Sequence, residues 1–126
     1  MNMKASKKKP QLSRTEALAS IPIKNTEVEE VLLESKDIIL IYPVKVKPWA
    51  AALLRKFGKP PGQIGQKKLQ LDALGTSVWK LLDGERTVKH IIKIFTRQQQ
   101  VHRKEAEVAV TQFLRELGKR GLIGIK

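Results

Sequence analysis

The segment from Leu69 to Ile125 constrains the fold most, because it alternates apolar stripes with residues that start or end helices. Asp72 and Thr87 are residue types that cap helix N-termini, and each precedes a stretch with apolar residues at helical spacing. A third such stretch spans roughly 103–120, and the glycine after it, Gly121, suits the left-handed position that follows many helices. The segment therefore predicts three short helices that pack around one core.

The apolar stripes also predict which side chains form that core. We expect it to contain Leu74, Val78, Trp79, Leu81 and Leu82 from the first helix, Val88, Ile91, Ile92 and Phe95 from the second, and Ala106, Ala109, Val110, Phe113, Leu114 and Leu117 from the third. Gly75 lies inside the first helix, where a glycine forfeits about 1 kcal/mol relative to alanine. We therefore expect another backbone to approach closely there. At the far end, Leu122 should contact Leu117, as in a Schellman motif.

The preceding half of the chain indicates a small antiparallel sheet. Residues 28–33 and 38–46 are rich in β-branched side chains and flank a polar turn, which predicts two strands joined tightly. Pro43 has no N–H to donate, so its part of the second strand should lie at an edge or a bulge. Residues 66–71 alternate between polar and apolar side chains and predict a third strand.

The N-terminal residues predict a disordered tail followed by a short helical turn. Residues 1–11 are basic and carry no apolar pattern, a composition that cannot offset the entropy of ordering the chain. Ser13 and Glu16 then have the spacing of a capping box, which predicts a helical turn from Ser13 to Ser20 before Pro22 ends it. Together these elements predict an α+β fold, a winged-helix-like three-helix bundle with a small antiparallel three-stranded sheet.

Charge is distributed unevenly along the chain. The 25 lysines and arginines outnumber the 12 acidic residues and give a formal net charge of +13, which favours nucleic acid, acidic peptides or membrane surfaces as partners. Seven basic residues and no acidic residue lie between positions 45 and 68, namely Lys45, Lys47, Arg55, Lys56, Lys59, Lys67 and Lys68.

Inside this basic block, Pro48 suits the first position of a helix. Trp49, Leu53, Leu54 and Phe57 then share one face, so we predict a basic amphipathic helix with a linker, together occupying 45–66. Two interpretations remain open for this helix: it packs on the body of the domain with its charges solvated, or it docks on a membrane surface or a partner.

The sequence argues against catalysis, metal binding and secretion. Cysteine is absent, and His90 and His102 lack the spacing of a metal site, so we expect neither a metal nor another cofactor. Asp72, Asp83 and Glu85 have sufficient roles at helix ends and turns. The N-terminus has no apolar region of a signal peptide, and no apolar run could cross a bilayer, so we expect a cytoplasmic protein.

The order and spacing of the apolar and capping residues resemble the PqqD (coenzyme PQQ synthesis protein D) family of peptide-recognition domains. The matching elements are Leu71-Asp72-x-x-Gly75, Val78-Trp79, Leu82-x-Gly84, Thr87-Val88-x-x-Ile91, Val110-x-x-Phe113-Leu114-x-x-Leu117 and Gly121-Leu122-Ile123. These elements span roughly Leu69 to Ile125, and the strand pair and basic helix before them resemble the longer stand-alone members back to about Ile21. We therefore expect residues 12–126 to form a single PqqD-like winged-helix domain that contains the basic helix and linker at 45–66.

The resemblance implies a non-catalytic adaptor. Such domains bind the leader segment of a ribosomally made precursor peptide by strand addition and present it to a modifying enzyme, a radical SAM enzyme in the PqqD case. In the family, the groove lies between the third strand and the third helix. Carried onto this chain, the strand would contribute Lys67, Lys68, Leu69 and Gln70. The helix residues that point away from the core at 100° per residue would be Lys104, Val108, Thr111, Gln112, Arg115 and Lys119.

Several of these residues also have simpler interpretations. Val108 could be covered by a ligand or be a lone exposed valine, since single apolar residues are common on protein surfaces. Lys104, Arg115 and Lys119 could attract acidic leader residues or be solvated charges. The alternative function is a winged-helix DNA-binding protein, which the net charge favours. Glu105 counts against it, because it would project near the phosphates at the start of the recognition helix.

Overall fold

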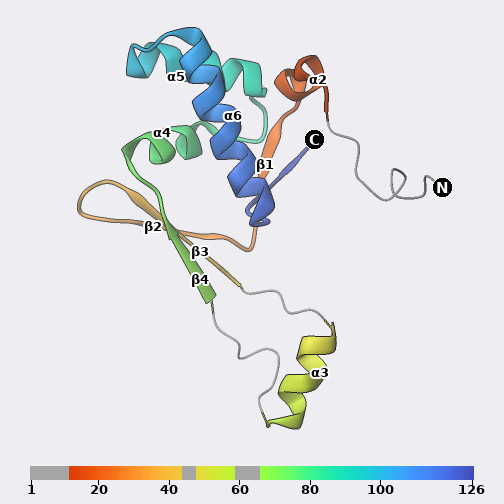
Figure 1. The fold of residues 1–126 in the computed structure, drawn as a ribbon. Coiled ribbons are helices and arrows are strands. Elements are labelled where there is room, and N and C mark those ends of the chain that lie inside the picture. The colour runs from red at the N-terminus through yellow and green to blue at the C-terminus, as the bar shows by residue number, and fades with distance from the viewer. Residues whose placement is uncertain (1–11, 44–47, 59–65) are drawn as a thin grey trace, which may run out of the picture.

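The structure, a computed structural model, describes residues 12–43, 48–58 and 66–126 (Figure 1). Three predicted segments lie outside the described residues: the tail at 1–11, the end of the second strand up to residue 46, and residues 59–65 of the linker.

The three predicted helices are present as α4 (Ala73–Leu81), α5 (Val88–Gln99) and α6 (Arg103–Lys119). The carboxylate of Asp72 accepts the Gly75 N–H at 2.7 Å and caps α4. The hydroxyl of Thr87 accepts the His90 N–H at 3.1 Å and caps α5. These two caps satisfy backbone donors that the first turn of a helix leaves unpaired, which is why each helix begins where the sequence predicts.

The end of α6 is the predicted Schellman motif. Gly121 has a φ of 75°, in the left-handed region that favours glycine. Its N–H donates to the Gly118 carbonyl at 3.0 Å, and the Leu122 N–H donates to the Leu117 carbonyl at 2.9 Å. Leu117 and Leu122 are both fully buried, so the end of α6 directs the chain back into the core.

A three-stranded antiparallel sheet lies beside the helices, in the order β2 (Glu29–Leu32), β3 (Ile38–Pro43), β4 (Gln66–Gln70). All three strands were predicted. Pro43 is the last residue of β3 and extends past the start of β2, whose Glu29 pairs with Ile41, so its missing N–H removes no bond from the β2–β3 ladder.

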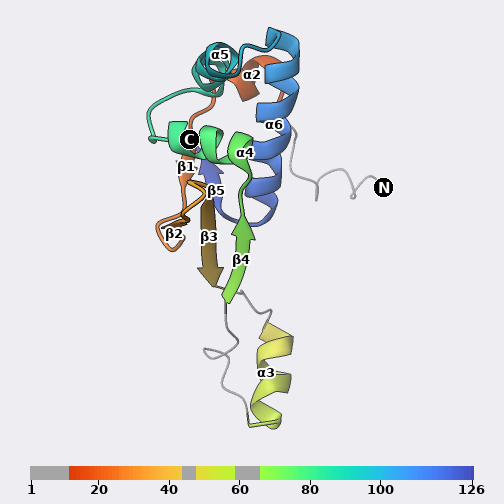
Figure 2. The ribbon, with the colours of Figure 1, turned by 90° about the vertical axis from the view of Figure 1, so that its left-hand side faces the viewer.

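A second sheet of two strands was not predicted as a sheet. β5 (Ile123–Ile125) follows the end of α6, and it pairs with β1 (Pro22–Lys24), a strand that the sequence did not indicate. Before β1, the short helix α2 (Arg14–Ala19) begins with the predicted capping box, since Ser13 and Glu16 each accept the other's backbone N–H. In Figure 2, β1 and β5 lie on the helical side of the three-stranded sheet.

The core contains most of the predicted residues, with two corrections. Leu74 is 49% exposed and Ala109 is exposed, although both were expected to be buried. Leu74 shares a helix face with Val78, but it lies in the first turn of α4, at the end of the buried stripe. Ala109 precedes Val110 by one residue, about 100° around the helix, at the edge of the buried face. Phe113 is only partly buried and packs against the core from outside.

The predicted basic helix forms as α3 (Pro48–Lys56), but it does not pack as the first interpretation required. Trp49, Leu53 and Phe57 are 68%, 48% and 73% exposed. Both Figure 1 and Figure 2 show α3 apart from the helices and sheets. The interpretation that this apolar face covers the body of the domain is therefore wrong.

Candidate functional site

Among the residues that the structure describes, β4 pairs with β3 alone and lies at one edge of the three-stranded sheet. Leu71, the residue after β4, donates its N–H to the Ile38 carbonyl at 2.8 Å. Because hydrogen-bonded and non-bonded positions alternate in an antiparallel pair, the backbone groups of Lys67 and Leu69 also face β3. The N–H and C=O groups of Gln66, Lys68 and Gln70 consequently point outward, where another strand could pair with them.

A shallow groove of about 280 Å³ runs between β4 and α6. Its lining consists of Leu69, Gln70, Leu71, Asp72, Phe113, Glu116, Leu117 and Arg120. Leu71 and Leu117 are buried and form an apolar floor. Glu116 and Arg120 supply one charge of each sign at the rim. An extended peptide on the β4 edge would thus meet apolar side chains below it and charges beside it.

Phe113, the aromatic side chain in the wall of this groove, explains why position 75 is a glycine. A β-carbon at Gly75 would lie 3.1 Å from Cε1 of Phe113 and 3.2 Å from Oδ1 of Asp72. The close neighbour is therefore an aromatic side chain rather than the backbone that the sequence led us to expect. The absence of a side chain at Gly75 lets the Phe113 ring lie against α4.

Arg120 connects the end of α6 to β3 through a hydrogen bond. Its Nη1 donates to the hydroxyl of Tyr42 at 3.2 Å. Tyr42 is buried on β3 and pairs with Lys67 of β4. This bond holds a guanidinium at the mouth of the groove, close to the strand edge.

The structure divides the predicted site residues into separate groups. Leu69 and Gln70 line the β4–α6 groove, and Lys67 and Lys68 are exposed on the same strand. None of the six predicted helix residues belongs to that lining. Lys104, Val108 and Gln112 are exposed to solvent, Val108 by 54%. Thr111, Arg115 and Lys119 line a different hollow, on the other flank of α6.

The residues that sequence reasoning missed are Phe113, Glu116 and Arg120. They lie about 60–120° from Val110 on one flank of α6, whereas Thr111 lies about 100° away on the other flank. The sequence does point to Phe113 as a groove residue, because it is a large apolar side chain at the edge of the apolar stripe of α6. Nothing in the helix itself identifies which flank faces the strand.

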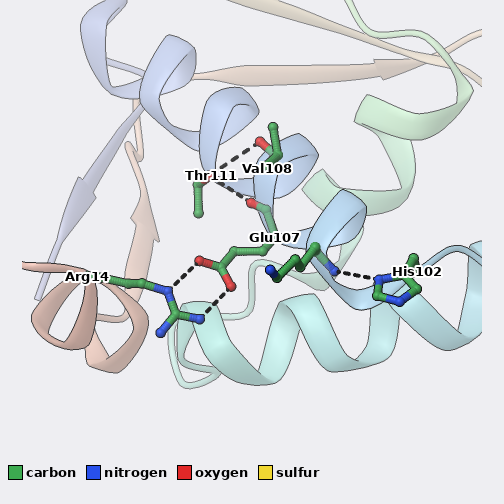
Figure 3. Close-up of polar contacts among 6 residues, drawn as sticks. Arg14, His102, Glu107, Val108 and Thr111 are labelled. Atoms are coloured by element: carbon green, nitrogen blue, oxygen red, sulfur yellow. Dashed lines mark hydrogen bonds and ion pairs between the residues drawn. The ribbon is translucent and has the colours of Figure 1, made fainter.

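The hollow on the other flank has a volume of about 1020 Å³ and lies among α2, α6 and β5. Arg14 of α2 reaches Glu107 of α6 through two hydrogen bonds of 2.8 Å, drawn in Figure 3. The hydrogen bond from Arg14 holds the pKa of the Glu107 carboxyl below its usual range. Thr111 donates its hydroxyl to the Glu107 carbonyl at 2.7 Å. This ion pair connects α2 to α6.

The two histidines have no ligand-like arrangement. His102 precedes α6 as its N-cap, and its Nδ1 accepts the Lys104 N–H at 3.4 Å (Figure 3). Within residues 12–43, 48–58 and 66–126, His, Asp and Glu side chains form no group of three that could hold a metal ion. The helices of the same residues include none with the length and apolar character that a membrane span requires.

Comparisons with known proteins support the fold and the family. No curated protein matches the chain. A solved structure described as "TbiB1 in Complex with the TbiA(beta) Leader Peptide" is similar to it, with a TM-score of 0.57 and 20% sequence identity over 80% of this chain and 93% of that chain. At this identity the likeness shows a shared fold. The family model described as Coenzyme PQQ synthesis protein D (PqqD) matches residues 63–123, the stretch that contains β4, α4, α5 and α6. Residues 63–123 of this chain therefore form a PqqD family domain.

Proposed function

We propose that this protein is a non-catalytic adaptor that binds the leader segment of a ribosomally made precursor peptide along the free edge of β4. The observation that carries the proposal is the position of that edge, whose outward backbone groups lie beside an apolar groove. The solved structure of similar fold is described as a complex with a leader peptide, which supports the same use of the fold here.

In the proposed mode, the leader adds a strand next to β4. Backbone hydrogen bonds to Gln66, Lys68 and Gln70 would supply affinity, and alternate leader side chains would enter the groove over Leu69 and Phe113. Such binding reads the leader through every second side chain, because successive side chains of a strand point to opposite faces.

The charged residues around the groove favour an acidic leader. Lys67 and Lys68 are exposed on the strand and Arg120 stands at the rim, so these three cations outnumber Asp72 and Glu116, the two acids of the lining. Lys104, Val108 and Gln112 lie on the exposed face of α6, outside that lining. Thr111, Arg115 and Lys119 lie in the hollow near α2, so the proposal places peptide contacts on Phe113, Glu116 and Arg120 instead.

The proposed second partner is a modifying enzyme to which the bound leader delivers its peptide. A radical SAM enzyme is the partner type that the PqqD resemblance implies. The adaptor itself needs no cofactor in this role, because strand addition uses backbone groups and side chains alone. The cytoplasm is the proposed location, since it is where precursor peptides are synthesised.

Fluorescence anisotropy with labelled leader peptides from small reading frames near the gene tests the proposal. We expect micromolar or tighter binding, about −8 kcal/mol or better. The variant Lys67→Glu/Lys68→Glu should weaken the binding of an acidic leader at least tenfold. The matched control is Lys89→Glu/Lys93→Glu, which makes the same charge change on the exposed face of α5, away from the groove, and should leave the affinity unchanged.

Amide hydrogen exchange tests the strand register independently of leader charge. The N–H groups of Lys67 and Leu69 face β3 and should be protected with or without peptide. Those of Lys68 and Gln70 face outward and should become protected only when the peptide binds. Equal protection of all four amides in the free protein would show that the edge is already occupied and would refute strand addition.

Nucleic-acid binding is the second candidate, favoured by the exposed Lys104, Arg115 and Lys119 on α6 and by the net charge of +13. Its signature would be a steep dependence of log affinity on log salt, because phosphate contacts release counterions. Strand addition predicts a shallow dependence. Measuring both ligands across a salt series separates the two functions.

A further inference from the structure

The helix α3 exposes a continuous apolar face that the rest of the fold does not explain. Trp49, Leu53 and Phe57 are 68%, 48% and 73% exposed. Successive members of this set are four residues apart, which keeps all three within about 80° of one another around the helix axis. Arg55 and Lys56 are exposed in the last turn of α3, and Arg55 lies on the side opposite the apolar face. The helix is therefore amphipathic and carries its hydrophobic side in water.

The charge around α3 is of one sign. From position 44 to position 71 the sequence contains seven basic residues and no acidic residue. Residues 1–15 and 86–104 also lack acidic residues, so the exposed apolar face of α3 is what distinguishes this block from the other basic stretches. A partner that covers α3 must thus combine negative charge with an apolar layer.

The location of α3 separates it from the peptide groove. It lies in the connection between β3 and β4, and the PqqD family match begins at residue 63, after α3 ends. The groove residues come from β4 and α6. Because neither the family match nor the groove lining includes α3, the helix can serve an additional role that leaves the groove unchanged.

We propose that α3 binds the surface of an anionic lipid bilayer. Trp49, Leu53 and Phe57 would enter the boundary between headgroups and acyl chains, while Arg55 and Lys56 contact the headgroups. Trp and Phe on one face with basic residues on the other are typical of helices that lie in a membrane interface. Anionic headgroups form a diffuse negative surface, which suits basic residues spread along a block rather than gathered at one point.

Two other partners fit the observations less well. A nucleic acid would satisfy the charge, but it would leave Trp49, Leu53 and Phe57 in water. An acidic protein groove would cover both the charge and the apolar face, but its fixed carboxylates would pair with only a few of the five basic residues at positions 45–59. A bilayer meets the apolar face and the basic residues of 45–59 together, and it leaves Lys67 and Lys68 of β4 to the peptide groove.

Vesicle binding measures the proposal directly. The full-length protein is titrated with vesicles of phosphatidylcholine alone and with vesicles that also contain phosphatidylglycerol, and the bound fraction is measured by sedimentation. We expect partitioning onto the phosphatidylglycerol vesicles to be at least about tenfold stronger, since each basic residue near an anionic surface adds attraction. Trp49 is exposed whereas Trp79 is fully buried, so binding should shift the tryptophan emission to shorter wavelength through Trp49.

Matched variants distinguish vesicle binding through α3 from vesicle binding caused by net charge alone. Arg55→Glu/Lys56→Glu and Lys89→Glu/Lys93→Glu change the protein's charge equally, but the second pair is exposed on α5. The α3 variant should lose vesicle binding at least tenfold, and the α5 variant should retain most of it. Leu53→Ser/Phe57→Ser keeps every charge and should lose both the binding and the emission shift.

Three results would overturn the proposal. Wild-type protein that stays in solution with both kinds of vesicle would assign the apolar face to a protein partner. Equal losses of vesicle binding in the α3 and α5 charge variants would show that net charge alone accounts for the binding. Unchanged binding by Leu53→Ser/Phe57→Ser would remove the role of the apolar face. Leader-peptide affinity measured on the same variants reports on the β4 groove separately, so neither proposal depends on the other.

Discussion

Replacing Gly75 with alanine tests the packing of the groove wall. The new β-carbon would lie 3.1 Å from Cε1 of Phe113, 3.4 Å from its Cζ and 3.2 Å from Oδ1 of Asp72. The first and third of these distances are shorter than ordinary van der Waals contact. Asp72 cannot yield easily, because its carboxylate caps α4 through the Gly75 N–H. Phe113 is only partly buried, so the ring should move toward the groove.

Two effects of opposite sign decide the stability of Gly75→Ala. Alanine favours a helix over glycine by about 1 kcal/mol. Overpacking against Phe113 and Asp72 costs about 1–3 kcal/mol. The net effect is a loss of about 0–2 kcal/mol, or up to about 8 °C in Tm at about 4 °C per kcal/mol for a domain of this size.

Gly118→Ala is the matched control, since Gly118 is also helical and its added β-carbon would meet nothing within 4 Å. It should gain up to about 1 kcal/mol from helix propensity alone. The difference between the two variants therefore isolates the overpacking cost, which should be about 1–3 kcal/mol. Because Phe113 lines the groove, Gly75→Ala should also weaken leader binding, whereas Gly118→Ala should not.

Thermal unfolding followed by circular dichroism, together with peptide anisotropy, provides both readouts. Equal rises in Tm for the two variants would refute the tight contact at Phe113. A destabilised Gly75→Ala that binds peptide as well as the wild type would instead refute the assignment of Phe113 to the binding wall.

Three further predictions concern the fold. Gly121→Ala forces alanine into a φ of 75° and should lower the free energy of unfolding by about 1 kcal/mol. Gly124→Ala should not, because Gly124 has space for a β-carbon and no positive φ, and thermal unfolding compares the two variants. Leu40→Ala removes a fully buried side chain from β3 and should cost about 2–5 kcal/mol in urea unfolding. Because Arg14 lowers the pKa of Glu107 in the folded protein, their ion pair should stabilise the fold at neutral pH and be lost as the pH falls through that lowered pKa. Carboxyl NMR titration should show the low pKa, and Glu107→Gln should remove this acid sensitivity.

The sequence predicts local structure well because the signals are themselves local. Asp72, Thr87 and Ser13 each cap a helix by accepting the backbone N–H three residues later, so the cap and its partner belong to the same short stretch of sequence. Gly121 ends α6 for the same reason. Each of these features depends on a few neighbouring residues, and each lies where the sequence places it.

Features that depend on distant partners were harder to predict. β1 is three residues long and is a strand only because β5, about a hundred positions later, pairs with it. The flank of α6 that meets β4 is likewise set by the packing of the whole bundle. The helical period gives the direction of Val110 toward the core, but Ala109 and Thr111 lie symmetrically on either side of it. The sequence therefore predicts a groove beside α6 and not which of its two flanks forms the wall.

The two lysines on β4 connect the proposed function with the risk that an open strand edge carries. An unpaired edge can join the same edge of another copy, and natural proteins often place lysine there to prevent it. Lys67 and Lys68 are adjacent and exposed, so two copies paired through β4 would bring like charges together. An acidic leader would meet the same lysines with favourable charge. The pair can thus disfavour self-association while favouring the proposed ligand, which is why an edge with outward backbone groups can persist in a protein whose role is to accept one additional strand.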